Sequence, residues 1–544
     1  MGKIRKIPQS LIGKIAAGEV IERPASALKE LIENSIDAGA TSLLIYIKEY
    51  GLAEIKVVDN GEGISSEDIE IAFERHATSK LEKDEDLFNI NTLGFRGEAL
   101  YSIAQVSKIR ILTQHREESI GSEVYIIGGE IVEKTKRGTI GTTIKIEDLF
   151  FNAPVRKKFL KSSFTERAHI IETVQNYALS FPQISFYLNI DGEEIFNLPS
   201  SNSVEERISQ LFGIDFLEKV NKREQSKDGY KITLFWGSDE LKRKVRTRQL
   251  IFVNKRPVRD PLIISTLYKA FEIKEGHPQF ILFLQVPNEK VDFNVHPAKK
   301  EVRFRDFNKI SELIFRLIER QKVSFVAERE VEWKKDFPSL SSPSQSTIFD
   351  EELKINKYES LEFLSLGDAI VAIKEEDGIL FIDVHAVHER INYEKLLNSM
   401  SPNTYRLVFP EIINLNPSEY SVIKENLTLL SELGIEAEDF GKNAIIIRGV
   451  PEILKDADIA QIIESIAFAI KEESGRIDLS DIKKKVASTI ACHSSLRAND
   501  RITEWALRKL LSELEKTLDS EHCPHGRPLK KFIPFSEIKR WFLR

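Results

Sequence analysis

The first long pattern in the chain is an amphipathic helix predicted over residues 24–38. Its apolar positions recur at helical spacing and are Leu28, Leu31, Ile32 and Ile36. Pro24 stands where the first turn of a helix tolerates proline, and Gly39 stands where helices commonly end. The polar face holds three residues at i, i+4 and i+7: Glu30, Asn34 and Asp37. The helix therefore presents two carboxylates and an amide along one line.

A strand-like run at 54–58 leads into a glycine turn. The turn places Asp59 just before two glycines, Gly61 and Gly63. Glycines let backbone approach a ligand closely, so a carboxylate beside them suits recognition of a small molecule. Taken singly, the helix and this turn would also fit a solvated helix face and an ordinary turn.

A third segment joins a loop to a helix that runs to about residue 104. The loop sets an aromatic and a cationic residue between two glycines: Gly94, Phe95, Arg96 and Gly97. Exposed backbone amides at the start of a helix form an anion site. Upstream, Thr78 and Lys80 supply a hydroxyl and an ammonium that also suit phosphate.

The pattern differs in the last third of the chain. A strand at 378–382 precedes His385 and Glu389, which a helix would place on one face because they are four residues apart. Residues 458–472 form a helix that is apolar on much of its surface, which predicts burial in a core or in a subunit interface. Serine and proline dominate residues 336–346, which indicates a linker.

Composition bounds the class of protein. At 544 residues the chain is too long for one core, and two to four domains are expected. Its two cysteines, Cys492 and Cys523, exclude a disulfide framework and fit a reducing cytoplasm. No apolar run is long enough to span a membrane, and we expect no signal peptide.

Positive charge is concentrated in one segment, although the net charge is −7. Residues 241–259 hold eight cations and no acid: Lys242, Arg243, Lys244, Arg246, Arg248, Lys255, Arg256 and Arg259. Neutralising phosphates requires clustered cations, so we predict a DNA contact through Lys255, Arg256 and Arg259. Few aromatics lie among the cations, which favours contacts to the DNA backbone over base stacking. A solvated strand edge is the alternative.

The ordered set of motifs in the first 143 residues resembles the ATP site of the GHKL superfamily. The set consists of the polar helix, the Asp-x-Gly-x-Gly turn, Thr-Ser-Lys, the loop at 94–100 and Gly-Thr-Thr at 141–143. Four longer segments are similar to the MutL family of mismatch-repair ATPases in particular: 15–24, 94–100, 149–160 and 294–304. This resemblance covers residues 1 to about 330 nearly continuously.

The resemblance implies a role for each residue of the ATP site. Glu30 would orient the attacking water, Asn34 would hold Mg²⁺ through its amide oxygen, and Asp59 would accept from the adenine amino group. The other nucleotide contacts would be Asp37, Gly61, Gly63, Thr78, Lys80, Gly94, Phe95, Arg96, Gly97 and Thr142. Lys299 matches the family lysine that reaches the γ-phosphate from the second lobe, so ATP could bias the orientation of the two lobes.

The C-terminal motifs resemble the endonuclease domain found in many MutL proteins. The resemblance implies a DNA-nicking metal site built by six residues, with Asp383 and Glu389 catalytic: Asp383, His385, Glu389, Cys492, Cys523 and His525. Such a ligand set suits Zn²⁺, and Mn²⁺ would support cleavage. The sequence departs from the family at Val384, which replaces a glutamine. It departs again at Tyr405, near the glutamine that usually opens the segment binding the sliding clamp.

We therefore expect an α/β protein of α+β sandwich type with four parts. They are a GHKL ATPase lobe at 1–200, a DNA-contacting, transducer-like α/β lobe at 201–330, a linker at 331–355, and an α+β dimerisation and endonuclease domain at 356–544. The expected partners are double-stranded DNA, a second copy in a homodimer and a MutS-like mismatch-recognition protein. A sliding clamp stays open as a partner. We expect a cytoplasmic, nucleoid-associated protein.

Two alternatives remain at this point. One is an ATP-dependent matchmaker with a structural zinc site and no cleavage. The other is a GHKL protein of a different kind, such as a topoisomerase subunit or a chaperone.

Overall fold

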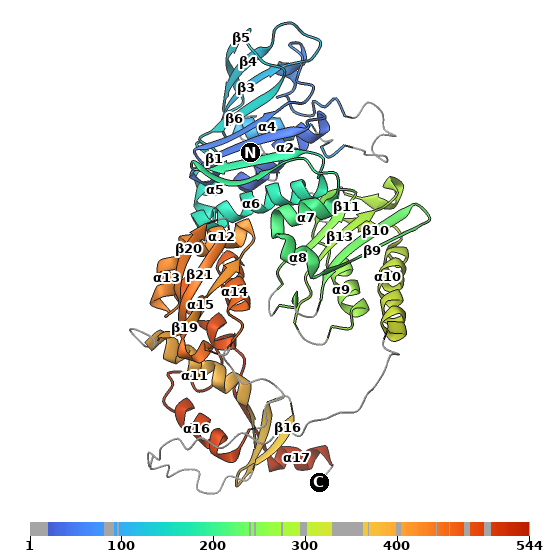
Figure 1. The fold of residues 1–544 in the computed structure, drawn as a ribbon. Coiled ribbons are helices and arrows are strands. Elements are labelled where there is room, and N and C mark those ends of the chain that lie inside the picture. Colours follow the sequence, from blue (N-terminus) through green and yellow to red (C-terminus); the bar gives the residue numbers. More distant parts are fainter. Residues whose placement is uncertain are drawn as a thin grey trace, which may run out of the picture.

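The structure of the protein is a computed structural model (Figure 1). It describes residues 20–80, 92–94, 97–238, 241–243, 246–273, 276–293, 302–328, 363–367, 369–398, 404–441, 443–455, 457–472, 479–493 and 502–542. Within these residues no helix combines the length and the apolar character needed to cross a membrane.

The first lobe is built on an eight-stranded sheet in the order β5-β4-β3-β6-β2-β1-β7-β8. Its neighbours are antiparallel except β1 and β7, which are parallel. The strands are β1 Ser42–Lys48, β2 Glu54–Asp59, β3 Lys108–Gln114, β4 Ser122–Ile127, β5 Glu130–Thr135, β6 Gly141–Glu147, β7 Ser185–Ile190 and β8 Glu193–Leu198. The helices are α2 Pro24–Asp37, α3 Asp68–Ile71, α4 Ala99–Gln105, α5 Pro154–Phe159 and α6 Ser163–Ser180.

Helix α2 forms where the sequence predicted it. Leu28, Leu31 and Ile32 are buried in the core beneath the sheet, so the predicted apolar stripe is confirmed. Gly39 follows the helix with φ +71°, a conformation that glycine adopts without steric cost. Because α2 contacts both α6 and β2, its polar face is held at a fixed place on the lobe.

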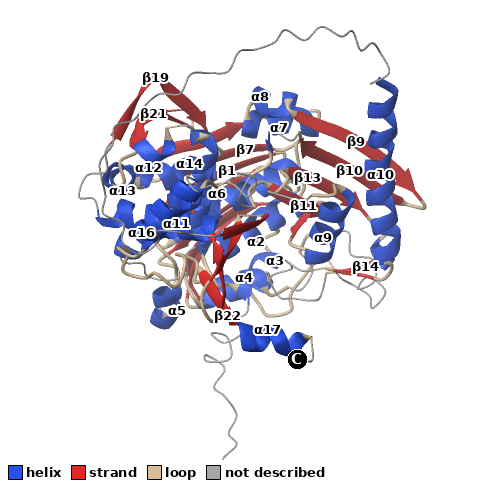
Figure 2. Ribbon diagram, turned by 90° about the horizontal axis from the view of Figure 1, so that it is seen from below, coloured by secondary structure: helices blue, strands red, loops and turns tan. Residues whose placement is uncertain are grey.

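The second lobe has a five-stranded sheet in the order β12-β11-β13-β10-β9. Its elements are α7 Val204–Phe212, α8 Ile214–Glu218, β9 Val220–Lys227, β10 Tyr230–Gly237, β11 Gln249–Val253, β12 Arg256–Val258, α9 Pro261–Ala270, β13 Phe280–Gln285, β14 Val291–Asp292, β15 Arg303–Phe304 and α10 Phe307–Glu328. Figure 2 shows α10 along the side of β9 and β10, which it contacts. The core of the first lobe continues into this one through Ile208, Phe235 and Phe252.

The C-terminal part contains two smaller sheets, β16-β17-β18-β22 and β19-β21-β20. Its strands are β16 Phe363–Gly367, β17 Ile370–Lys374, β18 Gly378–Asp383, β19 Thr404–Asn414, β20 Glu436–Gly441, β21 Ala444–Pro451 and β22 Lys530–Pro534. Its helices are α11 Val384–Asn398, α12 Pro417–Glu425, α13 Leu427–Glu432, α14 Ile459–Glu472, α15 Leu479–His493, α16 Glu504–Leu514 and α17 Phe535–Trp541. Helix α14 confirms the predicted apolar helix, and its isoleucines pack into a core with α12, α15 and the three-stranded sheet.

The C-terminal part also contacts the first two lobes, with α12 lying against α6 (Figure 1). Ion pairs cross this contact between Arg167 and Glu425, Glu193 and Lys424, Glu172 and Lys471, Arg243 and Glu464, and Arg248 and Glu419. Burial alone would raise the pKa of Glu172, but its ion pair with Lys471 lowers that pKa to about 2. The contact is therefore charged as well as apolar. It also engages two cations of the 241–259 basic segment, Arg243 and Arg248.

Candidate nucleotide and metal sites

Asp37, at the end of α2, holds the loop at residues 92–94. Its Oδ1 accepts a hydrogen bond from the Leu93 backbone N–H at 2.8 Å, and its Oδ2 accepts one from the Gly94 N–H at 2.9 Å. Lys80 Nζ lies 2.6 Å from Asp37 Oδ2 and 3.0 Å from Asn34 Oδ1. Four residues predicted to line the nucleotide site therefore lie together.

Glu30 lies on the same helix, within a buried network of charges. The residue is 8% exposed, and Lys29 Nζ is 2.8 Å from its Oε1. Lys29 also pairs with Glu33 at 3.2 Å, and Glu33 accepts a 2.5 Å hydrogen bond from the Tyr177 hydroxyl. Burial alone would lower the pKa of Lys29, but Glu30 and Glu33 raise it above its ordinary value. Lys29 therefore stays charged, and the position of the Glu30 carboxylate is restrained.

Asp59 is fixed by helix α2 and by the glycine turn. Its Oδ2 accepts from the Ser35 hydroxyl at 2.8 Å and its Oδ1 from the Gly61 N–H at 2.9 Å. Burial raises the pKa of Asp59, because desolvation disfavours the charged carboxylate. Gly63 has φ +80°, and a Cβ there would lie 2.1 Å from the Gln114 carbonyl oxygen. Both the strain and the clash require glycine at this turn.

Thr142 lies directly opposite Asp59 in the sheet, since β6 pairs with β2 in that register. Its hydroxyl is 3.1 Å from that of Thr113, which accepts the Ile64 N–H at 2.9 Å. The sheet thus brings Thr142 to the glycine turn. Gly97 has φ +62°, which an L side chain rarely adopts.

Three predicted nucleotide contacts, Phe95, Arg96 and Lys299, lie outside the described residues, as does the predicted linker. Thr78 is described, and its hydroxyl accepts the Lys80 N–H at 3.2 Å. Thr78 therefore stands beside the lysine that contacts Asn34 and Asp37.

The C-terminal part brings three of the predicted metal ligands together. One ligand atom each from Glu389, Cys523 and His525 lies within 4.8 Å of the other two. Glu389 is fully buried; its Oε1 is 2.9 Å from His525 Nδ1 and its Oε2 is 3.0 Å from an Arg527 nitrogen. Burial alone would raise the pKa of Glu389, but His525 and Arg527 lower it. A carboxylate, a thiol and an imidazole in this proximity fit a zinc ion.

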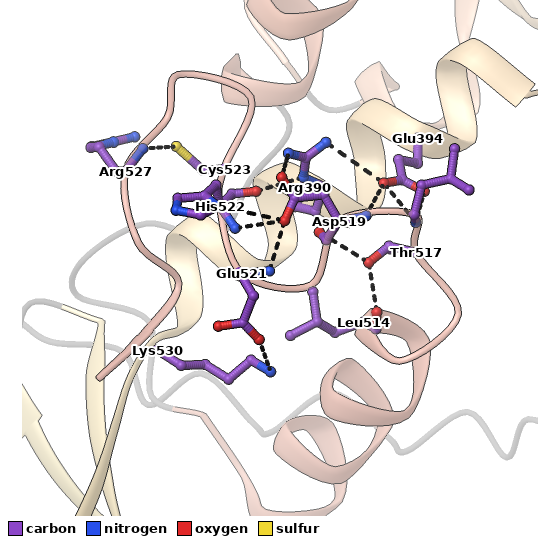
Figure 3. Close-up of polar contacts among 11 residues, drawn as sticks. Arg390, Glu394, Leu514, Thr517, Asp519, Glu521, His522, Cys523, Arg527 and Lys530 are labelled. Carbon is purple, nitrogen blue, oxygen red and sulfur yellow. Dashed lines mark hydrogen bonds and ion pairs between the residues drawn. The ribbon is translucent and has the colours of Figure 1, made fainter. Parts of the chain in front are cut away.

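The loop that carries Cys523 is anchored on α11 by Arg390, the residue after Glu389, and by Glu394 (Figure 3). Arg390 donates to the His522 carbonyl oxygen at 2.7 Å and to Asp519 at 3.0 Å. Glu394 accepts the Leu518 N–H at 2.8 Å. Both α11 side chains are largely buried, so they fix the loop against the helix that supplies the carboxylate.

The other three predicted ligands are not among the three members of this cluster. Asp383 precedes α11, and its Oδ1 accepts the Ala386 N–H at 2.9 Å, which is a helix cap. His385 follows on α11, one turn before Glu389. Cys492 lies on α15, whose Ser488 hydroxyl is 3.1 Å from His525 Nε2.

Comparisons with known proteins decide the family. Residues 21–144 match the histidine kinase-, DNA gyrase B- and HSP90-like ATPases, residues 208–322 the C-terminal domain of DNA mismatch repair proteins, and residues 365–502 the MutL C-terminal dimerisation domain. The chain is 59% identical over 545 residues to the DNA mismatch repair protein MutL of Thermodesulfovibrio yellowstonii, with 100% of both chains covered. It belongs to the MutL family.

The chain is also similar to other MutL proteins. MutL of Dictyoglomus thermophilum is 36% identical over 577 residues, again with 100% of both chains covered. Among solved structures, the ATPase domain of Aquifex aeolicus MutL complexed with ADP is 29% identical, with 55% of this chain and 98% of that chain covered and a TM-score of 0.40.

Membership of the MutL family confirms the resemblance and the α/β fold predicted from the sequence. The chain is a DNA mismatch repair protein with an ATPase domain and a C-terminal dimerisation domain. The alternative of a topoisomerase subunit or chaperone is thereby excluded.

The three cations that were predicted to contact DNA differ in their exposure to solvent. Lys255 and Arg259 are exposed, whereas Arg256 is 5% exposed. A buried guanidinium is not available to a phosphate at the surface, so Arg256 leaves the candidate set. Lys255 Nζ lies 5.3 Å from the centre of the Phe181 ring, which orients it without removing it from solvent.

Sequence reasoning missed the supporting residues of the nucleotide site. Lys29 and Glu33 are four residues apart, which is the spacing of a helical ion pair, so that pair could have been found. Tyr177 and Thr113 come from elements far away in the sequence, and nothing in the local pattern points to them.

Proposed function

We propose that this MutL-family protein is an ATP-dependent switch that nicks DNA at a metal site in its C-terminal part. The observation that carries the proposal is the cluster of Glu389, Cys523 and His525, which is built on helix α11 and one anchored loop. The non-cleaving matchmaker, in which zinc is purely structural, is the alternative. We also keep the four-part division of the chain, with boundaries at 200, 330 and 355, as a proposal.

In the ATPase lobe, Glu30 would act as the base and Asn34 would hold Mg²⁺. Asp59 would accept from adenine beside Gly61 and Gly63. Asp37 and Lys80 would support residues 92–94. The phosphates would be held by this segment together with Gly97, Thr78 and Thr142. Phe95, Arg96 and Lys299 complete the proposed set. Bound Mg²⁺ supplies charge neutralisation across the phosphates.

In the C-terminal part, Glu389, Cys523 and His525 would hold Zn²⁺, with Asp383, His385 and Cys492 contributing from neighbouring elements. A divalent ion there, Mn²⁺ in particular, supplies an activated water and stabilises charge on the phosphate. Val384 replaces the family glutamine, but its side chain is 3% exposed and packs in the core with Ala386 and Ile391. No metal ligand is proposed at position 384, so this departure leaves the proposed set of ligands unchanged.

A test of the metal site uses two histidines of one loop. His525 lies 2.9 Å from Glu389, whereas the side chain of His522 lies near Asp519 instead. Replacing His525 with alanine should remove most of the bound zinc, because a ligand is lost. Mass spectrometry of the purified proteins gives the zinc content per chain.

The matched control is His522→Ala, which removes a histidine that is also solvent-exposed but lies outside the cluster. It should keep its zinc. Equal zinc content in the two variants would remove His525 from the site and with it the main support for the proposed centre.

For DNA, we propose that Lys255 and Arg259 contact the phosphate backbone. Reversing both charges, Lys255→Glu with Arg259→Glu, should weaken binding to any sequence. It should also flatten the salt dependence by about one unit of slope per lost contact. Fluorescence anisotropy of a labelled duplex across a salt series measures the slope.

The control for charge alone is Lys136→Glu with Arg137→Glu, two exposed residues just after the edge strand β5. This variant has the same net charge and should keep the slope of the wild type. If both double variants behave alike, the DNA path lies elsewhere.

The dimerisation domain match supports a homodimer. The sheet β16-β17-β18-β22 packs one face on α11 and α16, while Leu364 and Ile370 are exposed on its other side. We propose that a second copy covers this apolar side.

The remaining partners are proposed from family membership. They are a MutS-like mismatch-recognition protein and a sliding clamp. Tyr405, Val408 and Phe409 are exposed on β19, but Tyr405 departs from the family's clamp-binding segment, so we assign no clamp site to this strand. We propose a cytoplasmic, nucleoid-associated location, since that is where the DNA substrate lies.

A further inference from the structure

Arg256 belongs to the basic segment by sequence but lies between the two N-terminal lobes. It opens β12, the edge strand of the second sheet, and β12 contacts α6 of the first lobe. A buried guanidinium costs free energy unless its donors are satisfied, so the partners of Arg256 indicate what it does.

Those partners come from both lobes. Arg256 Nη2 donates to the Thr92 carbonyl oxygen at 2.6 Å, and Thr92 belongs to the first lobe. The guanidinium carbon lies 4.8 Å from the centre of the Phe293 ring, in the core of the second lobe. Nη1 is buried and has no hydrogen-bond partner among the described residues. The side chain therefore joins the lobes through one strong hydrogen bond and one stacking contact.

Thr92 immediately precedes the two residues whose backbone Asp37 holds. The N–H groups of the two following residues point to Asp37, and the Thr92 hydroxyl donates to the Gly94 carbonyl oxygen at 2.7 Å. Leu93 and Gly94 are thus tied to α2 of the ATPase lobe, whereas Thr92 is tied to the second lobe. Phe293, in turn, immediately precedes the segment 294–301 that contains Lys299.

We propose that Arg256 is a positioning residue that couples the 92–94 loop to the second lobe. Through it, a change in the loop on nucleotide binding would alter the orientation of the second lobe. The proposal rests on the assignment of residues 92–94 to the nucleotide site. It also explains why a cation in a surface-charged segment is buried.

A lysine at this position would keep the charge but not the planar group that stacks on Phe293 while bonding to Thr92. An alanine would lose both contacts. Arg256→Lys should therefore weaken the coupling between the lobes in part, and Arg256→Ala should remove it. The control is Arg316→Ala, which replaces an exposed arginine on α10 of the same lobe.

The experiment measures steady-state ATPase kinetics, nucleotide-induced compaction by small-angle scattering with a non-hydrolysable ATP analogue, DNA binding across a salt series, and thermal stability. Arg256→Ala should lower kcat by about tenfold to a hundredfold, because small misplacements at a reacting centre have large effects on rate. The same variant should change KM less than kcat and should no longer compact when nucleotide binds. The salt dependence of its DNA binding should match that of the wild type. Arg256→Lys should be intermediate, and Arg316→Ala should match the wild type.

Two outcomes would overturn the proposal. If the variants lose stability but keep kcat and compaction, Arg256 only packs the lobes together. If they flatten the DNA salt slope as Lys255→Glu with Arg259→Glu should, Arg256 contacts DNA. Should Arg256→Ala fail to fold, Arg256→Lys carries the same test. A failure of the nucleotide-site assignment would appear in a separate measurement, because the Glu30→Ala variant would then still hydrolyse ATP.

Discussion

Replacing Glu30 with alanine should abolish ATP turnover and leave nucleotide binding in place. General bases typically contribute a factor of about 10²–10⁴ to rate, so turnover should fall by at least two orders of magnitude. Binding should persist because Asp59, Asp37 and Lys80 keep their own hydrogen bonds without Glu30. Lys29 would still be paired with Glu33, so its buried charge would keep a partner. A coupled phosphate-release assay and nucleotide-binding calorimetry measure the two quantities.

Asn34→Ala provides the contrast within the same helix. It removes the proposed magnesium ligand and a partner of Lys80, so it should weaken binding of Mg·ATP itself. Glu30→Gln, which keeps the shape of the side chain, should resemble Glu30→Ala. Hydrolysis at the wild-type rate by either Glu30 variant would show that another group activates the water.

Replacing Asp383 with asparagine should eliminate DNA nicking and leave ATPase activity intact. The hard ion that positions a phosphate needs an anionic oxygen, and asparagine removes the charge. Asparagine should nevertheless keep the helix, because its side-chain oxygen can accept the Ala386 N–H as the carboxylate does. Plasmid nicking in Mn²⁺ and ATP hydrolysis are measured on the same preparation.

Cys523→Ser is a less clean variant. The thiol is 2% exposed and lies in the core formed by α11, α16 and the four-stranded sheet. Loss of a zinc ligand there could unfold the region as well as silence it. Normal nicking by Asp383→Asn would contradict the endonuclease proposal, and the matchmaker with structural zinc would then account better for this half of the chain.

The sequence predicted elements whose cause is local. Helix α2, the strand β18 followed by α11, and α14 all appear where periodicity placed them. The glycine turn is also local, since Gly63 adopts a positive φ that few residues tolerate. Three of six metal ligands come together because α11 fixes Glu389 and the loop carrying Cys523 is anchored to the same helix.

What the sequence could not provide depends on contacts between distant segments. The sequence gives no sign that Arg256 differs from the exposed cations around it. It is buried because β12 packs beside α6. Arg243 and Arg248 belong to the basic segment read from the sequence, but Glu464 and Glu419 of the C-terminal part form ion pairs with them. Helix α14 could have served a core or a subunit interface, and its core position follows from partners more than a dozen residues away.

Nicking of supercoiled plasmid by the wild-type protein, with and without Mn²⁺ and ATP, tests the central claim most directly. The account predicts open-circular product with Mn²⁺ and more of it when ATP is present. No nicking in Mn²⁺ by a preparation that hydrolyses ATP and contains its zinc would contradict it.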